Sequence, residues 1–307
     1  MDGNLYVLLY HESISQSIFL SAPKRAILWG MKAFWNQTIV DAADIRISPS
    51  DLGMLRGYTV FDVMPVENGH GFLWERHYDR LCRSAESIGM AVPISREVYG
   101  AAIEDLIHQS ETAELVLRTV LSGGPSENGF APNPGQETFY ILAEERHRLP
   151  ESVYDEGVKL ITLPYERYLP QVKFANHAIS LWDIKRRQTE GAFDTLYVSQ
   201  GLISEASQGN ILIMKDGVLI TPREEVLWGI TQGVVMELAE QIGMSTEWRG
   251  VTLAETLAAD EVLLTGSSKG IVPVVRIDDT VIGDGRPGPG TARLALALAD
   301  LVQEQNA

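Results

Sequence analysis

Two short signatures in this sequence carry side chains suited to covalent and electrostatic chemistry. Lys173 lies within Val172–Asn176, and Glu205 lies within Ile203–Asn210. A lysine amine can attack an aldehyde once burial or a nearby cation lowers its pKa from about 10.4. A carboxylate can hold a heteroaromatic ring nitrogen in its protonated form. Together the two groups would serve a cofactor that carries both an aldehyde and a ring nitrogen.

Each residue also has an ordinary structural interpretation. A single lysine is most often a solvated surface residue, and a glutamate in a polar turn is most often exposed. We place Lys173 at a strand or loop edge that faces a cavity, ahead of a helix with a polar start at Asn176. We place Glu205 in a turn after Ser199–Gly201, among small and polar residues that would let a flat ring approach.

A third group of residues could bind a phosphate. Gly229–Thr231 precedes a helical run, so backbone amides and the Thr231 hydroxyl would face an anion at a helix N-terminus. The alternative is that Thr231 is a plain N-cap. Thr265–Ser268 ends a predicted strand with hydroxyl groups that could form a second arm. Arg80 would add a guanidinium fork, unless it pairs with an acidic neighbour on its own helix.

Hydrophobic periodicity predicts the elements that position these groups. Strands are predicted near residues 34–40, 58–64, 114–121, 138–143, 158–163, 195–199, 211–215 and 261–265. Helices are predicted near residues 75–90, 95–109, 179–190, 231–242 and 290–302. Interleaved strands and helices with hairpin signals favour an α+β fold over a doubly wound parallel sheet.

Composition shifts and breakers predict the domain organisation. Residues 1–30 form an N-terminal extension of uncertain order, and 31–146 form a smaller α/β domain. A charged linker with a proline covers 147–154, and 155–307 form a larger cofactor-binding domain. The glycine- and proline-rich stretch 123–135 predicts a surface loop.

Bulk composition narrows the class of protein. The 307 residues are 45% hydrophobic, which is enough to bury the cores of two domains. A formal net charge of −16 argues against nucleic acid and membrane surfaces as partners. The single cysteine, Cys82, cannot form an intrachain disulfide, and the six histidines are scattered, so no metal site is predicted. The sequence thus indicates a cytoplasmic protein.

Taken in order, the motifs resemble the class IV aminotransferases, also called fold-type IV pyridoxal phosphate enzymes. The ordered set is Glu75-Arg-His77-Tyr-Asp79-Arg80-Leu81, Lys173-x-x-Asn176, Glu205-Ala-Ser-x-x-Asn210, Thr221-Pro222, Gly229-Ile230-Thr231 and Thr265-Gly-Ser267-Ser-x-x-Ile-x-Pro273. The family includes D-amino acid and branched-chain aminotransferases, (R)-amine transaminases and aminodeoxychorismate lyase. The resemblance implies a two-domain fold like that of D-amino acid aminotransferase, with pyridoxal 5'-phosphate between the domains.

The resemblance also implies roles for individual residues. Lys173 would form a Schiff base with the cofactor and carry the proton, and Glu205 would hold the ring nitrogen. The phosphate would be bound by Arg80, Ile230, Thr231 and Ser267. A homodimer is implied, in which a neighbouring subunit completes the site, and Arg56 and the loop 123–135 are the parts suited to reach across.

Departures from the family pattern concern the substrate. Arg56 stands where many members have a tyrosine, and Gln232 stands where an arginine is frequent. Ser122 replaces the arginine usual in D-amino acid aminotransferases. We hypothesise that Arg56 and Arg118 receive the substrate carboxylate and that Phe61 lines the pocket. The alternative is that either arginine forms a structural ion pair.

These features favour an aminotransferase that takes D-amino acids as donors and a 2-oxo acid such as 2-oxoglutarate as acceptor, in a ping-pong cycle. The preference rests on the two arginines and on the short Lys173-x-x-Asn176 signature, which lacks the Gly-Asn-Tyr typical of branched-chain members. A branched-chain L-amino acid or (R)-amine transaminase is the alternative within the family. An aminodeoxychorismate lyase is the alternative of another reaction class.

Overall fold

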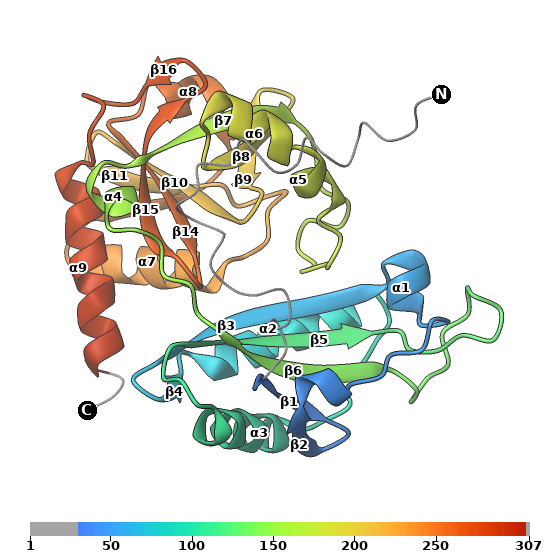
Figure 1. The fold of residues 1–307 in the computed structure, drawn as a ribbon. Helices are drawn as coiled ribbons and strands as arrows, with labels where there is room; N and C mark the ends of the chain where they lie inside the picture. Colours follow the sequence, from blue (N-terminus) through green and yellow to red (C-terminus); the bar gives the residue numbers. More distant parts are fainter. Residues whose placement is uncertain (1–29, 305–307) are drawn as a thin grey trace, which may run out of the picture.

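A computed structural model of the chain describes residues 30–304. Two β-sheets organise these residues, and each forms the centre of one lobe (Figure 1). The change from the first sheet to the second falls between residues 145 and 158. The linker predicted at 147–154 lies within this interval and stays a prediction, as do the other domain limits. The extension predicted over residues 1–30 lies, apart from Gly30, outside the described residues.

The first lobe contains a six-stranded antiparallel sheet in the order β2-β1-β6-β5-β3-β4. Its strands are β1 Lys32–Trp35, β2 Thr38–Asp41, β3 Thr59–Glu67, β4 His70–Gly71, β5 Leu115–Ser122 and β6 Thr138–Glu145. Its helices are the 3-10 turn η1 Ala42–Asp44, α1 Leu52–Arg56, α2 Trp74–Glu86 and α3 Arg96–Gln109. The helices α2 and α3 supply the residues that cover one face of this sheet.

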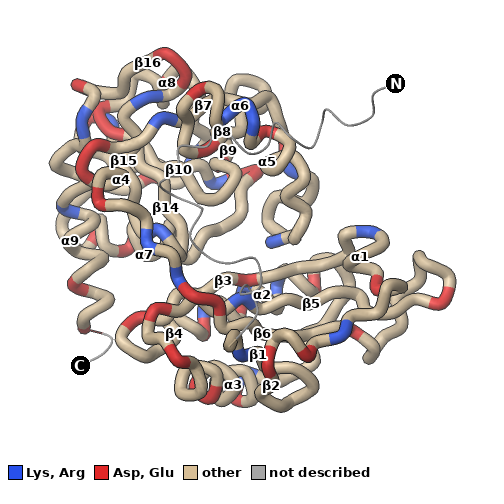
Figure 2. The backbone as a smooth tube through the Cα atoms, viewed as in Figure 1, with Lys and Arg blue, Asp and Glu red and all other residues tan. Residues whose placement is uncertain are grey.

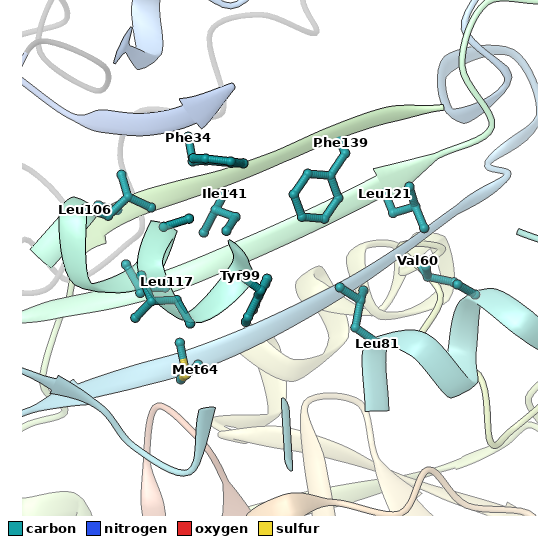
Figure 3. Packing of buried hydrophobic residues seen from close by; sticks show 14 of the residues in the cluster. Phe34, Val60, Met64, Leu81, Tyr99, Leu106, Leu117, Leu121, Phe139 and Ile141 are labelled. Atoms are coloured by element: carbon teal, nitrogen blue, oxygen red, sulfur yellow. The ribbon is translucent and has the colours of Figure 1, made fainter. Parts of the chain in front are cut away.

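Alternation along the strands decides which side chains face these helices. Leu117 and Leu121 of β5 are buried against α2 and α3 together with Leu81 and Tyr99 (Figure 3). Arg118, which lies between them in β5, therefore points to the opposite face of the sheet. That face is the one turned toward the second lobe.

The second lobe contains a ten-stranded mixed sheet in the order β12-β11-β10-β14-β15-β7-β8-β9-β13, with β16 on β15. Its strands are β7 Val158–Pro164, β8 Asp194–Ser199, β9 Leu202–Ala206, β10 Gly209–Lys215, β11 Val218–Thr221, β12 Ser245–Trp248, β13 Val251–Thr252, β14 Glu261–Gly266, β15 Gly270–Ile277 and β16 Thr280–Val281. Its helices are α4 Ser152–Asp155, α5 Ala178–Trp182, α6 Ile184–Glu190, α7 Ile230–Gln241, α8 Leu253–Leu257 and α9 Pro289–Glu304. Most strand pairs are antiparallel, which confirms the α+β class.

Two sequence-based predictions are wrong in detail. Glu205 lies in strand β9, not in a turn, and it pairs with Asn210 of β10. The helix predicted over 179–190 is divided into α5 and α6 at Asp183. The buried carboxylate of Asp183 accepts hydrogen bonds from Thr195 Oγ1 at 2.6 Å and Arg186 Nε at 2.7 Å. A short polar side chain that makes such hydrogen bonds favours a break in the helix at its position.

Candidate active site

A cavity of about 400 Å³ lies between the two lobes. Four basic side chains line it, Arg80, Arg118, Arg167 and Lys173, whereas Glu205 is the one acidic residue among the described residues of its lining. Figure 2 shows acidic residues distributed along the backbone of both lobes, and basic residues on segments that include those where the lobes face each other. A positive cavity in a protein of net charge −16 favours small anions.

The main chain of Lys173 is attached to the first lobe, although its segment follows β7 of the second. The Lys173 carbonyl accepts a hydrogen bond from Phe61 N at 3.0 Å, and Ala175 N donates to Thr59 O at 3.0 Å. Lys173 N donates to Ser84 Oγ of α2 at 3.2 Å. The segment thus adds a short stretch of strand to the edge of β3, which agrees with the predicted loop or strand edge.

Burial lowers the pKa of Lys173 to about 7, and the nearby Arg80 guanidinium adds to this effect. The carboxylates of Asp62 and Glu205 oppose the shift but do not cancel it. Its Nζ atom lies 4.8 Å from the centroid of the Phe61 ring. A substantial fraction of this amine is therefore neutral near pH 7, as a nucleophilic amine requires.

Glu205 is 6% exposed, and both of its oxygens have partners. Arg167 Nη1 donates to Oε1 at 2.5 Å, and Leu227 N donates to Oε2 at 3.1 Å. Burial raises the pKa of Glu205, and the charge and hydrogen bond of Arg167 counteract that rise. The sequence analysis did not identify Arg167, because its segment has no regular pattern and its partner is distant in the chain.

Arg80 lines the cavity on its first-lobe side and is held there by Asp62 of β3. Arg80 Nε and Nη2 each donate to the Asp62 carboxylate at 2.8 Å. The same carboxylate lies 2.6 Å from Nδ1 of His77, one turn before Arg80 in α2. The alternative of a surface pair within the helix is therefore wrong. Asp62, which sequence analysis missed, orients the guanidinium toward the cavity.

The N-terminus of α7 faces the same cavity through Gly229, Ile230 and Thr231. Gln232 fixes this turn, because its Oε1 accepts from Gly229 N at 3.1 Å and its Nε2 donates to Thr221 Oγ1 at 2.7 Å. A Cβ atom on Gly229 would lie 2.0 Å from Asn210 Oδ1, so any larger residue would displace the Asn210 side chain. Gln232 therefore has a structural role at the position where an arginine is frequent.

Thr265 and Ser267 line the cavity at the end of β14. Thr265 Oγ1 is buried and has no hydrogen-bond partner among the described residues. A buried hydroxyl without a protein partner is available to hydrogen-bond a group bound in the cavity. Hydroxyls, the amides of a helix N-terminus and a guanidinium form a donor set for phosphate. The site therefore fits a phosphorylated heteroaromatic cofactor with an aldehyde.

The three substrate-binding candidates occupy different places. Phe61 and Arg118 line the cavity, whereas Arg56 does not. Arg118 Nε and Nη2 bind Glu144 at 2.6 and 2.9 Å, which leaves Nη1 for another partner. The Arg56 guanidinium lies 4.1 Å from the centroid of the Phe130 ring at the far end of the first lobe. The structure thus brings one of the two arginines to the site.

His177 also lines the cavity and was not identified from the sequence as a site residue. Its ring lies 5.5 Å from that of Phe61 in an edge-on arrangement. Burial and the nearby cations lower its pKa, so the imidazole is neutral at physiological pH. The available signal was its position in the turn directly after Lys173-x-x-Asn176.

Comparison with known proteins gives consistent results. The profile of the family described as amino-transferase class IV matches residues 59–277. A putative branched-chain-amino-acid aminotransferase of Methanocaldococcus jannaschii is 30% identical over 280 residues, covering 88% of this chain and 96% of that protein. The D-alanine aminotransferase of Bacillus licheniformis is 29% identical over 286 residues, covering 90% of this chain and 99% of that protein.

Solved structures share the fold. The branched-chain amino acid aminotransferase of Escherichia coli has a TM-score of 0.83 at 23% identity, covering 90% of this chain and 96% of that chain. The fold IV transaminase of Curtobacterium pusillum has a TM-score of 0.77 at 23% identity, covering 89% and 99%. A further branched-chain amino acid aminotransferase, solved with pyridoxamine 5'-phosphate, has a TM-score of 0.81 at 24% identity, covering 89% and 94%. Because each alignment covers both lobes, the two-domain arrangement is confirmed.

Proposed function

Because this chain belongs to the class IV aminotransferases, which are pyridoxal-phosphate-dependent enzymes, we propose that it transfers an amino group from a D-amino acid to a 2-oxo acid such as 2-oxoglutarate. One observation carries the proposal: Lys173, Glu205 and the hydrogen-bond donors suited to a phosphate line the same cationic cavity. Arg118 lies in that lining as well. When bound, the cofactor supplies an electron-withdrawing ring that stabilises negative charge at the substrate's α carbon.

We assign the chemistry of the chain as follows. Lys173 would hold the cofactor covalently through Nζ, and the same atom would carry the proton that leaves the substrate's α carbon. Glu205 accepts a hydrogen bond from the protonated ring nitrogen. The phosphate is held by Arg80, Ile230, Thr231 and Ser267. The amino acid and the 2-oxo acid react in turn at one site, which gives ping-pong kinetics.

The proposed donor has two supports, one for an amino acid and one for the D form. Arg118 offers Nη1 to a carboxylate, which favours amino acids over simple amines. Several of the curated relatives, including the Bacillus licheniformis protein, are D-alanine aminotransferases. Branched-chain L-amino acids are the alternative, supported by the Methanocaldococcus jannaschii relative. An aminodeoxychorismate lyase would share Lys173 and Glu205 and is the alternative of another reaction class.

A donor panel tests this proposal. The purified holoenzyme is incubated with matched D- and L-alanine and D- and L-leucine in the presence of 2-oxoglutarate, and glutamate is measured. Turnover with the D-amino acids in excess of the L forms is expected. Preference for L-leucine would move the assignment to the branched-chain enzymes. Pyruvate release from aminodeoxychorismate, with no glutamate from any donor, would support the lyase and overturn the proposal.

The assignment of Arg118 predicts a substrate-binding defect on substitution. In Arg118→Ala the carboxylate loses a charge-assisted hydrogen bond of about 1.5–3 kcal/mol, so the KM for amino donors should rise roughly 10- to 100-fold. Steady-state kinetics measure this change, with Arg148→Ala as a control because that arginine pairs with Glu114 at the surface. An unchanged KM for every donor would remove Arg118 from the site.

The lowered pKa of Lys173 predicts how the apoenzyme takes up cofactor with pH. The neutral amine reacts, so the rate of covalent uptake should increase with pH and level off above about 7, where Lys173 is deprotonated. Below that pH the rate should fall about tenfold per unit, because the reactive fraction falls by that factor. Stopped-flow absorbance after mixing apoenzyme with pyridoxal phosphate measures the rate. A rate that rises steadily to about pH 10 would show an ordinary lysine.

We also propose that the enzyme is a cytoplasmic homodimer. Met54 of α1, Phe130 of the predicted loop and Trp182 of α5 are 73%, 74% and 70% exposed, and a second subunit that covered them would remove their apolar surface from water. They come from both lobes. Arg56, stacked on Phe130, would then lie at the subunit contact. Within residues 30–304 no helix is long and apolar enough to cross a membrane.

A further inference from the structure

Arg167 connects two parts of the cavity, the carboxylate of Glu205 and the turn that leads to Lys173. Its Nη1 donates to Glu205 Oε1 and, at 2.9 Å, to the carbonyl of Pro170. Its Nη2 donates to the carbonyl of Val172 at 2.8 Å. One planar guanidinium therefore makes three hydrogen bonds, and none of its acceptors lies in a helix.

The two carbonyls belong to a tight turn that ends directly before Lys173. Leu169 has a φ of 48°, in the left-handed region, and Val172 N donates to Leu169 O at 2.9 Å. The side chain of Val172 is 2% exposed and packs in the core of the first lobe. Backbone carbonyls that are shielded from water need hydrogen-bond donors, and Arg167 donates to two carbonyls of this turn. These bonds hold the guanidinium in place beside Glu205.

The charge of Arg167 acts on both reactive groups. Its side chain is 19% exposed and that of Glu205 is 8% exposed, so the pair is largely shielded from solvent. A buried carboxylate without a cation takes up a proton. The same cation opposes protonation of Lys173. A single guanidinium therefore favours the charged form of the acid and the neutral form of the amine.

We propose that Arg167 is a positioning residue for amino transfer, which holds Glu205 as an ionised acceptor for the ring nitrogen, and that the turn before Lys173 keeps its guanidinium in place. This inference rests on the proposed roles of Glu205 and Lys173. The effect of Arg167 on the reaction passes through Glu205, the carboxylate that it binds. Loss of the guanidinium should therefore resemble loss of the Glu205 charge.

A double-mutant cycle tests this coupling. Arg167→Met, Arg167→Lys, Glu205→Gln and the double variant Arg167→Met/Glu205→Gln are purified, and two quantities are measured. The first is the dissociation constant of pyridoxal phosphate from each apoenzyme, by fluorescence, and the second is the rate of the half-reaction with an amino donor at saturating cofactor. Arg148→Met serves as the matched control. Like Arg167, Arg148 binds a glutamate, here through two hydrogen bonds to Glu114, but this pair lies at the surface.

Arg167→Met is expected to weaken cofactor binding about tenfold and to slow the half-reaction roughly 100-fold, close to the loss in Glu205→Gln. The double variant should lose little more than either single variant, because the two residues act as one unit. Arg167→Lys, which keeps the charge, should recover most of the half-reaction rate. Arg148→Met should leave both quantities unchanged.

Two results would overturn the inference. Losses that multiply in the double variant would show that Arg167 acts independently of Glu205. A lower melting temperature in Arg167→Met with a normal half-reaction rate would show a purely structural arginine. If Arg167→Met does not fold, Arg167→Gln replaces it in the same cycle. A normal rate in Glu205→Gln alone would instead contradict the proposed role of Glu205, which separates the two failures.

Discussion

Replacement of Lys173 by alanine is expected to lower turnover by roughly four orders of magnitude, the upper end of the range for a residue that carries the proton in the reaction. The cofactor should still bind through the phosphate donors at Arg80 and the N-terminus of α7, but without a covalent link. Steady-state rates with the best donor and the visible absorbance of the loaded protein measure the two effects. No other amine of the described residues lines the cavity, so no substitute is available.

Lys269→Ala is the control for that experiment. Lys269 is the strongest rival from the sequence because it lies within Thr265–Pro273, and burial lowers its pKa as well. Its Nζ lies 5.3 Å from the centroid of the Phe193 ring, away from the cavity lining. The Lys269 variant should keep the covalent cofactor and its activity. Normal absorbance in Lys173→Ala together with its loss in Lys269→Ala would transfer the role to Lys269.

Glu205→Gln is expected to slow the half-reaction with an amino donor by roughly 10²- to 10³-fold at saturating cofactor, the usual cost of removing one preorganised electrostatic group. The amide keeps the size of the side chain but cannot hold a proton on the ring nitrogen, and it leaves Arg167 without its ionic partner. Stopped-flow absorbance measures the rate of the half-reaction. Covalent binding of the cofactor should persist, because Lys173 is unchanged.

Glu166→Gln is the matched control for this variant. Glu166 is exposed and accepts a hydrogen bond from Ser199 Oγ at 2.9 Å, outside the cavity lining. Its substitution should leave the half-reaction unchanged. Equal losses in the two variants would indicate a general effect of charge on this acidic protein, and a normal rate in Glu205→Gln would contradict the assigned role.

The sequence predicted the elements whose signals are local. Amphipathic spacing located α2, α3, α7 and α9 within a few residues, because each buries one face against a sheet. Strand β15 was missed, because Gly270 and Pro273 interrupt its apolar pattern. Strand β9 was taken for a turn, because it has only five residues, contains Ser204 and Glu205, and follows Gly201 directly. It pairs with the strands on either side of it in the sequence, β8 and β10, through short turns.

Those parts of the site that lie in local sequence motifs were also predictable. Lys173, Glu205, Thr231 and Ser267 lie in contiguous motifs, and the structure gathers all of them around one cavity. The ionic partners of Arg80 and Glu205 were not predictable, because they come from other segments of the chain. Asp62 is 18 residues from Arg80, and Arg167 is 38 residues from Glu205.

Of the three substrate-binding candidates, the structure places Phe61 and Arg118 in the cavity lining, and their role stays a prediction. Arg56 was grouped with Arg118 because arginines bind carboxylates, but sequence cannot say which side of a lobe a residue faces. The structure places Arg56 on Phe130, outside the cavity of its own chain. Its role in the substrate site therefore depends on the proposed dimer.

The central claim is that Lys173 is the residue that binds the cofactor covalently. Reduction of the holoenzyme with borohydride, followed by digestion and peptide mass spectrometry, tests it most directly, because reduction makes the link permanent. We predict a phosphopyridoxyl group on Lys173 and on no other lysine. A modified Lys269, or a fully loaded protein with no modified lysine, would contradict this claim.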